Sequence, residues 1–120
     1  MKSATLVLVD DHVTFRARAR VLLESFGFTV IGEAGTGTEA LRAVRALRPD
    51  IVLLDIVLPE LDGFAICEQL AAEHCSSTIV LTSTRDVSVY RRRLTASSAR
   101  GFIPKHELTG ASLAALIGSG

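Results

Sequence analysis

Short apolar segments alternate along this chain with longer segments in which apolar residues recur at helical spacing. The short segments are residues 6–9, 28–31, 51–54, 78–81 and 101–103. Apolar runs of this length are typical of strands buried in a parallel sheet. The longer segments predict helices at residues 16–26, 64–74, 86–98 and 109–117, with another between Thr36 and Pro49.

Two of the predicted helices carry additional signals. Residues 36–39 match a capping box, in which the Thr36 hydroxyl and the Glu39 carboxylate accept hydrogen bonds from free backbone N–H groups. Pro49 should end this helix, because proline has no N–H to continue the hydrogen-bond ladder. For the first helix we expect a buried apolar stripe formed by Val21, Leu22 and Phe26.

Five strands that alternate with five helices define the fold class. Short loops and strands apolar on both faces predict an α/β protein with a doubly wound parallel sheet. With 120 residues the chain is long enough for one core, so we expect a single domain over residues 1–120.

The composition excludes several classes of protein. Hydrophobic residues make up 48% and aromatic residues 5% of the chain, which predicts an aliphatic core. The 13 basic and 13 acidic residues balance, so no basic surface for direct nucleic-acid or membrane binding is expected. No apolar run approaches the roughly 20 residues of a membrane span. We expect a cytoplasmic protein in which Cys67 and Cys75 are reduced thiols.

Polar side chains with related chemistry follow four of the five predicted strands. Asp10 and Asp11 follow the first strand, Asp55 the third, Thr82 the fourth, and Lys105 lies just past the fifth. Ligands bind at the carboxyl ends of the strands in an open parallel sheet. We therefore expect these five side chains to converge on one edge.

The chemistry of this group favours phosphoryl transfer. Carboxylates brought so close repel one another, and a divalent cation relieves the repulsion. Mg²⁺ prefers oxygen ligands and is typically held by one or two carboxylates together with phosphate oxygens. A hydroxyl and an ammonium can neutralise a transferring phosphoryl group, and a central carboxylate such as Asp55 can accept it.

The same residues carry a resemblance to a known family. The chain resembles the receiver domain of two-component response regulators over nearly its whole length. The matching motifs are Leu-Val-Leu-Val-Asp10-Asp11, Leu-Leu-Asp55-Ile-Val-Leu-Pro59-Glu-Leu-Asp62-Gly63, Ile-Val-Leu-Thr82-Ser and Gly101-Phe102-Ile-Pro-Lys105. The segment 101–108 is most similar to regulators in which the receiver precedes a helix-turn-helix output domain.

The resemblance implies a flavodoxin-like fold with strand order 2-1-3-4-5, and it implies Mg²⁺ as cofactor. It also implies a role for each residue of the site. Asp55 is implied as phosphoacceptor and Asp11 and Asp55 as direct metal ligands, with Asp10 acting through water and Val57 through its carbonyl. Thr82 and Lys105 are implied as contacts of the phosphoryl oxygens, and Thr82 and Phe102 as switch residues.

The resemblance further implies a signalling switch in transcriptional regulation. A sensor histidine kinase would be the phosphoryl donor, and the protein would catalyse only its own phosphorylation and dephosphorylation rather than act as an ordinary enzyme. The face formed by the fourth helix, fifth strand and last helix would change and control an output domain or partner, or allow a homodimer. DNA binding would belong to a separate C-terminal domain. One departure from the family is the absence of glycine in residues 96–99, which predicts an irregular end to the fourth helix.

Three alternatives remain open at this stage. Gly35, Gly37 and Ala40 fit a dinucleotide-binding fingerprint, although this motif follows the second strand and leaves the acidic residues unexplained. A haloacid-dehalogenase-type phosphatase also uses an aspartyl phosphate but would have a second acid at position 57, where this chain has Val57. The third alternative is a pseudo-receiver, an interaction module that works without phosphorylation.

Overall fold

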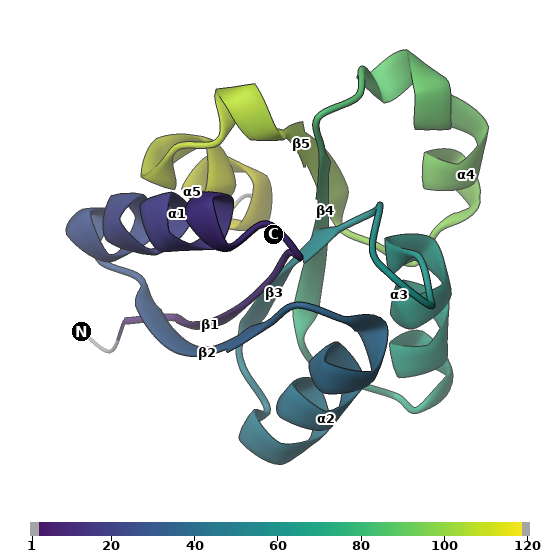
Figure 1. Cartoon of the computed structure of the whole chain (residues 1–120), viewed down its shortest axis with the longest axis horizontal. Coiled ribbons are helices and arrows are strands. Elements are labelled where there is room, and N and C mark those ends of the chain that lie inside the picture. The colour runs from purple at the N-terminus through teal and green to yellow at the C-terminus, as the bar shows by residue number, and fades with distance from the viewer. Residues whose placement is uncertain (1–2, 119–120) are drawn as a thin grey trace.

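The computed structural model describes residues 3–118, and its centre is one parallel sheet of five strands. The strands are β1 (Thr5–Val9), β2 (Thr29–Ala34), β3 (Ile51–Asp55), β4 (Thr78–Ser83) and β5 (Gly101–Pro104). They are ordered β2-β1-β3-β4-β5 across the sheet (Figure 1), which confirms the predicted flavodoxin-like topology. The remaining residues of the expected domain, 1–2 and 119–120, lie outside the described part of the chain.

Helices cover both faces of the sheet. They are α1 (Val13–Phe26), α2 (Gly37–Leu47), α3 (Gly63–Ala72), α4 (Arg91–Ala96) and α5 (Gly110–Gly118), with short 3₁₀ turns at η1 (Val87–Tyr90) and η2 (Lys105–Glu107). Figure 1 shows α1 and α5 side by side over one face, and α2, α3 and α4 over the other. No helix within residues 3–118 has the length and apolar character that crossing a membrane requires.

Alternate residues of each central strand supply two separate cores. In β1, Leu6 and Leu8 pack in the core beneath α1 and α5, whereas Val7 and Val9 pack in the core beneath α2 and α3. This alternation explains why the strands are apolar on both faces. Cys67 lies in the second of these cores as a free thiol.

The stripe predicted for α1 is wrong. Val21, Leu22 and Phe26 are 67%, 41% and 53% exposed, and the buried residues of the helix are Ala19 and Leu23. The helix carries apolar residues on more than one side, so periodicity alone did not identify the side that meets the sheet.

The start of α2 agrees with the predicted capping box in part. The Thr36 hydroxyl accepts a hydrogen bond from the Glu39 amide at 3.2 Å. The Glu39 carboxylate accepts from the amide of Gly35, one residue before the position expected of a capping box. The helix ends at Leu47, just before Pro49, as predicted.

The fourth helix differs from the prediction of one continuous helix over residues 86–98. Asp86 caps the 3₁₀ turn η1 by accepting a hydrogen bond from the Ser88 amide at 2.9 Å, and α4 proper has only six residues. At Ser97 the chain leaves helical geometry with a ψ of 152°. Without a glycine to adopt a left-handed cap, the helix ends in an extended residue, and this irregular end was predicted.

Polar contacts, which we call the α3–α4 ties, hold this short helix against α3. The Arg93 guanidinium lies 2.7 Å from the Asp62 carboxylate and 4.2 Å above the centre of the Phe64 ring. At the other end of α4, the Glu68 carboxylate accepts hydrogen bonds of 2.8 Å from both the amide and the hydroxyl of Ser98. Glu68 thereby holds the residues that follow α4 against α3.

Candidate functional site

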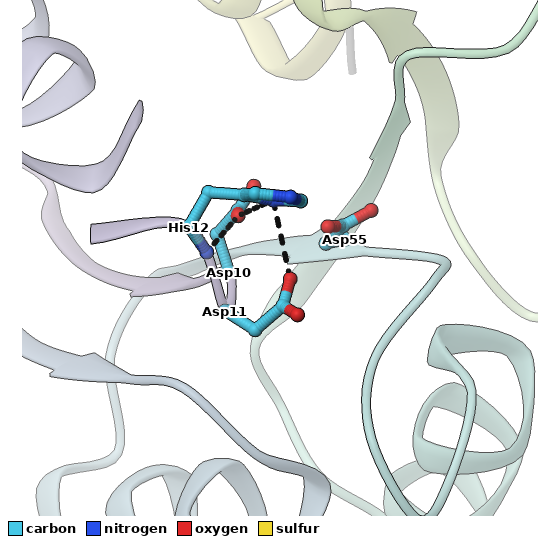
Figure 2. Close-up of side chains that lie close together, drawn as sticks. All are labelled: Asp10, Asp11, His12 and Asp55. Atoms are coloured by element: carbon cyan, nitrogen blue, oxygen red, sulfur yellow. Dashed lines mark hydrogen bonds and ion pairs between the residues drawn. The ribbon is translucent and has the colours of Figure 1, made fainter. Parts of the chain in front are cut away.

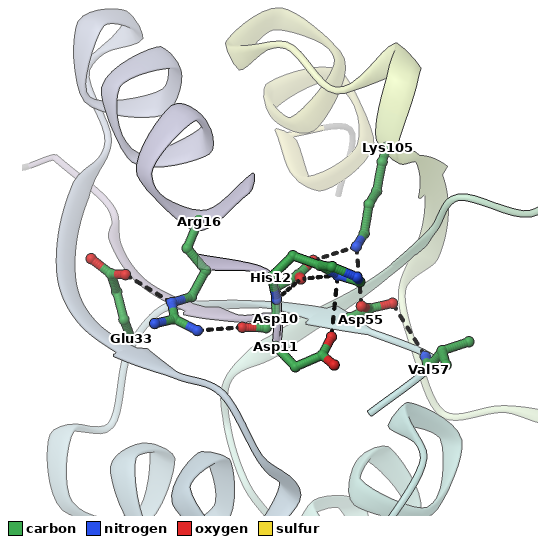
Figure 3. A network of polar contacts seen from close by, with 8 residues as sticks. All are labelled: Asp10, Asp11, His12, Arg16, Glu33, Asp55, Val57 and Lys105. Carbon is green, nitrogen blue, oxygen red and sulfur yellow. Dashed lines mark hydrogen bonds and ion pairs between the residues drawn. The ribbon is translucent and has the colours of Figure 1, made fainter. Parts of the chain in front are cut away.

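The ends of three strands bring the predicted acidic and basic side chains together. Asp10 and Asp11 follow β1, Asp55 ends β3, and Lys105 follows β5. Figures 2 and 3 show their side chains pointing toward one another at one edge of the sheet. Asp10 and Asp55 are each only 2% exposed, although their side chains are ionisable.

Lys105 is the cation at the centre of this group. Its ammonium lies 2.6 Å from Oδ2 of Asp10 and donates a hydrogen bond to Oδ2 of Asp55 at 3.1 Å (Figure 3). It also lies 4.7 Å above the centre of the Phe15 ring. Burial alone would lower the pKa of Lys105, but its contacts with Asp10 and Asp55 outweigh this effect and raise the pKa. Lys105 is therefore charged at neutral pH.

One ammonium does not balance the negative charge of the site. Ligand oxygens of Asp10, Asp11 and Asp55 lie within 4.8 Å of one another, so one Lys105 ammonium leaves two negative charges uncompensated. Burial, followed by repulsion from Asp10, raises the pKa of the Asp55 carboxyl. Oδ2 of Asp10 is buried, and the described residue that pairs with it is Lys105, whose ammonium lies 2.6 Å away. The charge and the oxygen donors fit a divalent cation such as Mg²⁺.

Thr82 lies beside Asp55 in the sheet. The two residues are paired in register between β3 and β4, and Thr82 is almost fully buried. In parallel strands, paired residues present their side chains on the same face of the sheet. Thr82 therefore lies in the position expected of a residue that would contact a group on Asp55.

Phe102 lies in β5 and is partly buried against the core beneath α3. Its ring centroid is 6.2 Å from that of Tyr90, which in turn lies 5.9 Å from that of Phe64. Tyr90 also places its hydroxyl 3.3 Å from the hydroxyl of Ser83, the residue after Thr82. A connected row of side chains thus leads from the end of β4 to Phe102.

Val57 follows Asp55 in the loop that leaves β3. Its side chain is exposed, and its amide donates a hydrogen bond of 3.2 Å to Oδ1 of Asp55. This contact orients the carboxylate and places the backbone of Val57 at the site.

Sequence reasoning missed two residues on α1 and β2 that hold the loop after β1. Arg16 donates a hydrogen bond of 2.5 Å to the backbone carbonyl of Asp10, and its Nε donates to the Glu33 carboxylate at 3.0 Å (Figure 3). Because Arg16 is six residues from Asp10 and Glu33 comes from another strand, no local motif indicated this network. It fixes the backbone from which Asp10 and Asp11 project.

Sequence reasoning also missed Tyr90 and Ser83. Tyr90 is the single tyrosine of the chain and is buried, although it lies in a segment rich in arginine. Ser83 directly follows Thr82 at the end of a buried strand.

With this geometry established, comparison with known proteins identifies the class. The family model of the response regulator receiver domain matches residues 6–117. The chain therefore belongs to the response regulator receiver domains of two-component systems.

Individual relatives agree with this assignment. A putative transcriptional regulator of Pseudomonas aeruginosa is 33% identical over 102 residues, which are 85% of this chain and 49% of that protein. A relative from Bordetella pertussis, named virulence factors putative positive transcription regulator BvgA, is 36% identical over the same shares of the two chains. The chain spans about half the length of these relatives.

A solved structure shares both the fold and part of the sequence. The receiver domain of the response regulator NarL of Mycobacterium tuberculosis superimposes with a TM-score of 0.85 at 29% identity, covering 98% of this chain and 99% of that one. A LuxR-family response regulator of Aurantimonas gives the same TM-score at 30% identity, covering 98% and 87%.

The dinucleotide-binding alternative finds no support in the structure. A Cβ atom at Gly37 would lie 3.0 Å from Leu61, and one at Gly35 would lie 3.2 Å from the Arg16 guanidinium. Side chains of the protein itself therefore pack closely around both glycines. The glycine turn instead leads into the helix that Thr36 caps.

Proposed function

We propose that this domain accepts a phosphoryl group on Asp55 in a Mg²⁺-dependent reaction and uses it to change the surface around α4, β5 and α5. The observation that carries the proposal is the buried Asp55 carboxylate, placed between two other carboxylates and the Lys105 ammonium. A histidine kinase is the proposed donor. An Asp55 oxygen forms a bond to phosphorus while the P–N bond of the donor phosphohistidine breaks.

Each residue has a proposed part in this reaction. Asp11 and Asp55 would hold Mg²⁺ directly, with Asp10 acting through a water and Val57 through its backbone carbonyl. When bound, the metal supplies positive charge to the carboxylates and to the phosphoryl oxygens. Lys105 is held by Asp10 beside Asp55, so it can contact a phosphoryl oxygen without moving far.

The first prediction tests the acceptor. Incubation with acetyl phosphate and Mg²⁺ should add one phosphoryl group, a mass increase of about 80 Da, and Asp55→Asn should abolish it because the attacking carboxylate is gone. Asp62→Asn is a matched control, since Asp62 caps α3 and asparagine caps equally well. Intact-mass spectrometry reads the result. An equal mass gain in Asp55→Asn would remove Asp55 as the acceptor.

The proposed switch uses Thr82 and Phe102. A phosphoryl group on Asp55 offers an acceptor to the Thr82 hydroxyl, and movement of Thr82 toward it vacates space beneath α4. Phe102 can turn into this space, because its ring already packs against Tyr90, the residue just before α4. The surface of α4, β5 and α5 then changes shape and controls a partner, a second copy or an output domain.

The second prediction tests this coupling. In Thr82→Ala the phosphoryl mimic beryllofluoride should still bind, but amide NMR shifts over residues 87–102 should change by less than half as much as in the wild type. Thr84→Val is the control, since Thr84 is exposed two residues further along. Shift changes of wild-type size in Thr82→Ala would show that the coupling does not run through Thr82.

Two parts of the prediction from sequence stay predictions. The separate DNA-binding domain is suggested by the transcriptional regulators among the relatives, which are about twice as long as the matched region. The cytoplasmic location is the second part of the prediction that stays untested. A pseudo-receiver is disfavoured by the presence of all three carboxylates and Lys105 at the site.

A further inference from the structure

Arg16 contacts the main chain of the acidic site from outside that site. It lies near the start of α1, where its amide donates a hydrogen bond of 3.0 Å to the carbonyl of His12. Its side chain is only 19% exposed, and its Nη1 donates to the carbonyl oxygen of Asp10 at 2.5 Å (Figure 3). Arg16 therefore contacts the backbone of Asp10, whereas Lys105 contacts the carboxylate of the same residue.

A second partner restrains the Arg16 side chain. Its Nε donates a hydrogen bond of 3.0 Å to the carboxylate of Glu33 on β2. Glu33 also accepts a hydrogen bond of 2.7 Å from Nη1 of Arg20, one turn further along α1. The hydrogen bond from Arg20, and after it that from Arg16, lowers the pKa of Glu33 against the effect of burial. Glu33 is therefore charged at neutral pH, and the Arg16 guanidinium bridges it to the Asp10 carbonyl.

Hydrogen bonds on both sides of Asp10 fix the backbone at the end of β1. Its amide donates a hydrogen bond of 3.0 Å to the carbonyl of Ala34 on β2. Its carbonyl, which accepts from Arg16, belongs to the peptide unit that leads into Asp11. A peptide unit is planar, so a restrained carbonyl also restrains the rotation of the backbone that would swing Asp11. The direction in which Asp11 projects therefore depends on Arg16.

We propose that Arg16 is a positioning residue of the metal site, which it shapes by holding the Asp10 carbonyl and thereby the direction of Asp11. The inference rests on the proposed function and adds to it a residue that would contact neither the metal nor the phosphoryl group. Removal of groups that orient metal ligands from behind commonly weakens metal binding by about 10- to 100-fold. Arg16 acts in this way through the main chain.

A purely electrostatic role makes the opposite prediction. The Arg16 guanidinium is a positive charge beside a site for a cation, and like charges repel. If only this charge mattered, removal of Arg16 would strengthen Mg²⁺ binding. A positioning role requires that removal weaken Mg²⁺ binding, because Asp11 is then no longer held in one direction.

The experiment compares Arg16→Met with Arg20→Met by calorimetric titration of Mg²⁺. Both arginines lie on α1 and pair with Glu33, but Arg16 donates to the Asp10 carbonyl and Arg20 to that of Val30. Methionine retains an aliphatic side chain and donates no hydrogen bond. We expect the affinity for Mg²⁺ to fall about tenfold in Arg16→Met, as for other groups that orient metal ligands. In Arg20→Met it should stay near the wild-type value.

A second readout requires no metal. In metal-free protein the carbonyl ¹³C resonance of Asp10 should move upfield in Arg16→Met, because this carbonyl has lost its hydrogen bond from the guanidinium. The same resonance should stay in place in Arg20→Met. Circular dichroism of both variants shows that they are folded under the conditions of the titration.

Arg16→Lys separates charge from hydrogen-bond geometry. Lysine retains the cation but lacks the planar fork that reaches two partners at once, so Mg²⁺ affinity should fall in this variant too. Wild-type affinity in Arg16→Lys, tighter binding in Arg16→Met, or equal losses in Arg16→Met and Arg20→Met would overturn the inference. In each of these cases the proposed function stands, provided that the wild type binds Mg²⁺ and Asp55→Asn abolishes phosphorylation.

Discussion

Replacement of Lys105 by methionine is expected to cost about 3 kcal/mol of folding stability in metal-free protein at pH 7, because removing one partner of a buried ion pair leaves the other uncompensated. Here two buried carboxylates, Asp10 and Asp55, would face each other without the ammonium that lies 2.6 and 3.1 Å from them. Urea unfolding followed by circular dichroism, in the presence of a chelator, measures the loss.

The same variant should recover stability as the pH falls. The pKa of the Asp55 carboxyl is raised by burial and by Asp10, and Lys105 opposes this rise. Without Lys105 the folded protein binds the proton still more tightly than the unfolded chain does. Stability therefore increases as the pH falls through the raised pKa of the folded state toward the ordinary carboxyl pKa, and the deficit of the variant is largest at neutral pH.

Two controls isolate the charge. Lys105→Arg retains a cation and should lose less stability than Lys105→Met. Adding Asp55→Asn to Lys105→Met removes one of the opposed carboxylates and should restore more than half of the loss. A deficit of Lys105→Met below about 1 kcal/mol, the value of an exposed pair, would show that water already solvates and screens these carboxylates.

Gly63→Ala should cost about 2–3 kcal/mol, in the range of overpacking where the obstacle is backbone. Its Cβ would lie 2.5 Å from the carbonyl oxygen of Asp55 and 2.9 Å from the Cα of Ile56. The Gly63 amide also donates a hydrogen bond of 2.8 Å to the carbonyl of Ile56, so the loop is closed back upon β3. Relief of the clash requires movement of the end of β3, where Asp55 lies, and of the loop that carries Val57, so Mg²⁺ binding should weaken as well.

Gly118→Ala is the matched control for this prediction. A Cβ at Gly118 would meet no atom within 4 Å, so the substitution should be neutral in thermal and urea unfolding. Equal stability of the two alanine variants would mean that the loop after β3 yields without cost.

The strands and the acidic site could be predicted from sequence because both depend on local patterns. The central strands β1, β3 and β4 each contain a continuous apolar run, and parallel strands necessarily bring Asp10, Asp55 and Lys105 to one edge. Contacts between distant segments could not be predicted in this way. The hydrogen bond from Arg16 to the carbonyl of Asp10 is of this kind, and so is the ion pair of Arg93 with Asp62.

The errors in the helices have a related cause. The sequence of α1 has apolar residues on several sides, and only the packing of Leu23 against the sheet determines which side is buried. For α4, capping by Asp86 and the contacts of Glu68 with Ser98 divide and shorten a segment that looks continuous. Arg93 likewise packs over the Phe64 ring, although the run of arginines in which it lies suggests a solvent-exposed face.

The α3–α4 ties have a consequence for how α4 responds to its surroundings. The side chains of Arg93 and Asp62 are 53% and 38% exposed, so dissolved ions reach the pair and weaken it. The 2.7 Å between the two charges is shorter than the Debye length of about 8 Å at physiological salt but close to the length of about 3 Å at 1 M salt, so concentrated salt weakens the pair most. We therefore expect Arg93 and Asp62 to hold α4 less firmly as the ionic strength rises, independently of any phosphoryl group on Asp55.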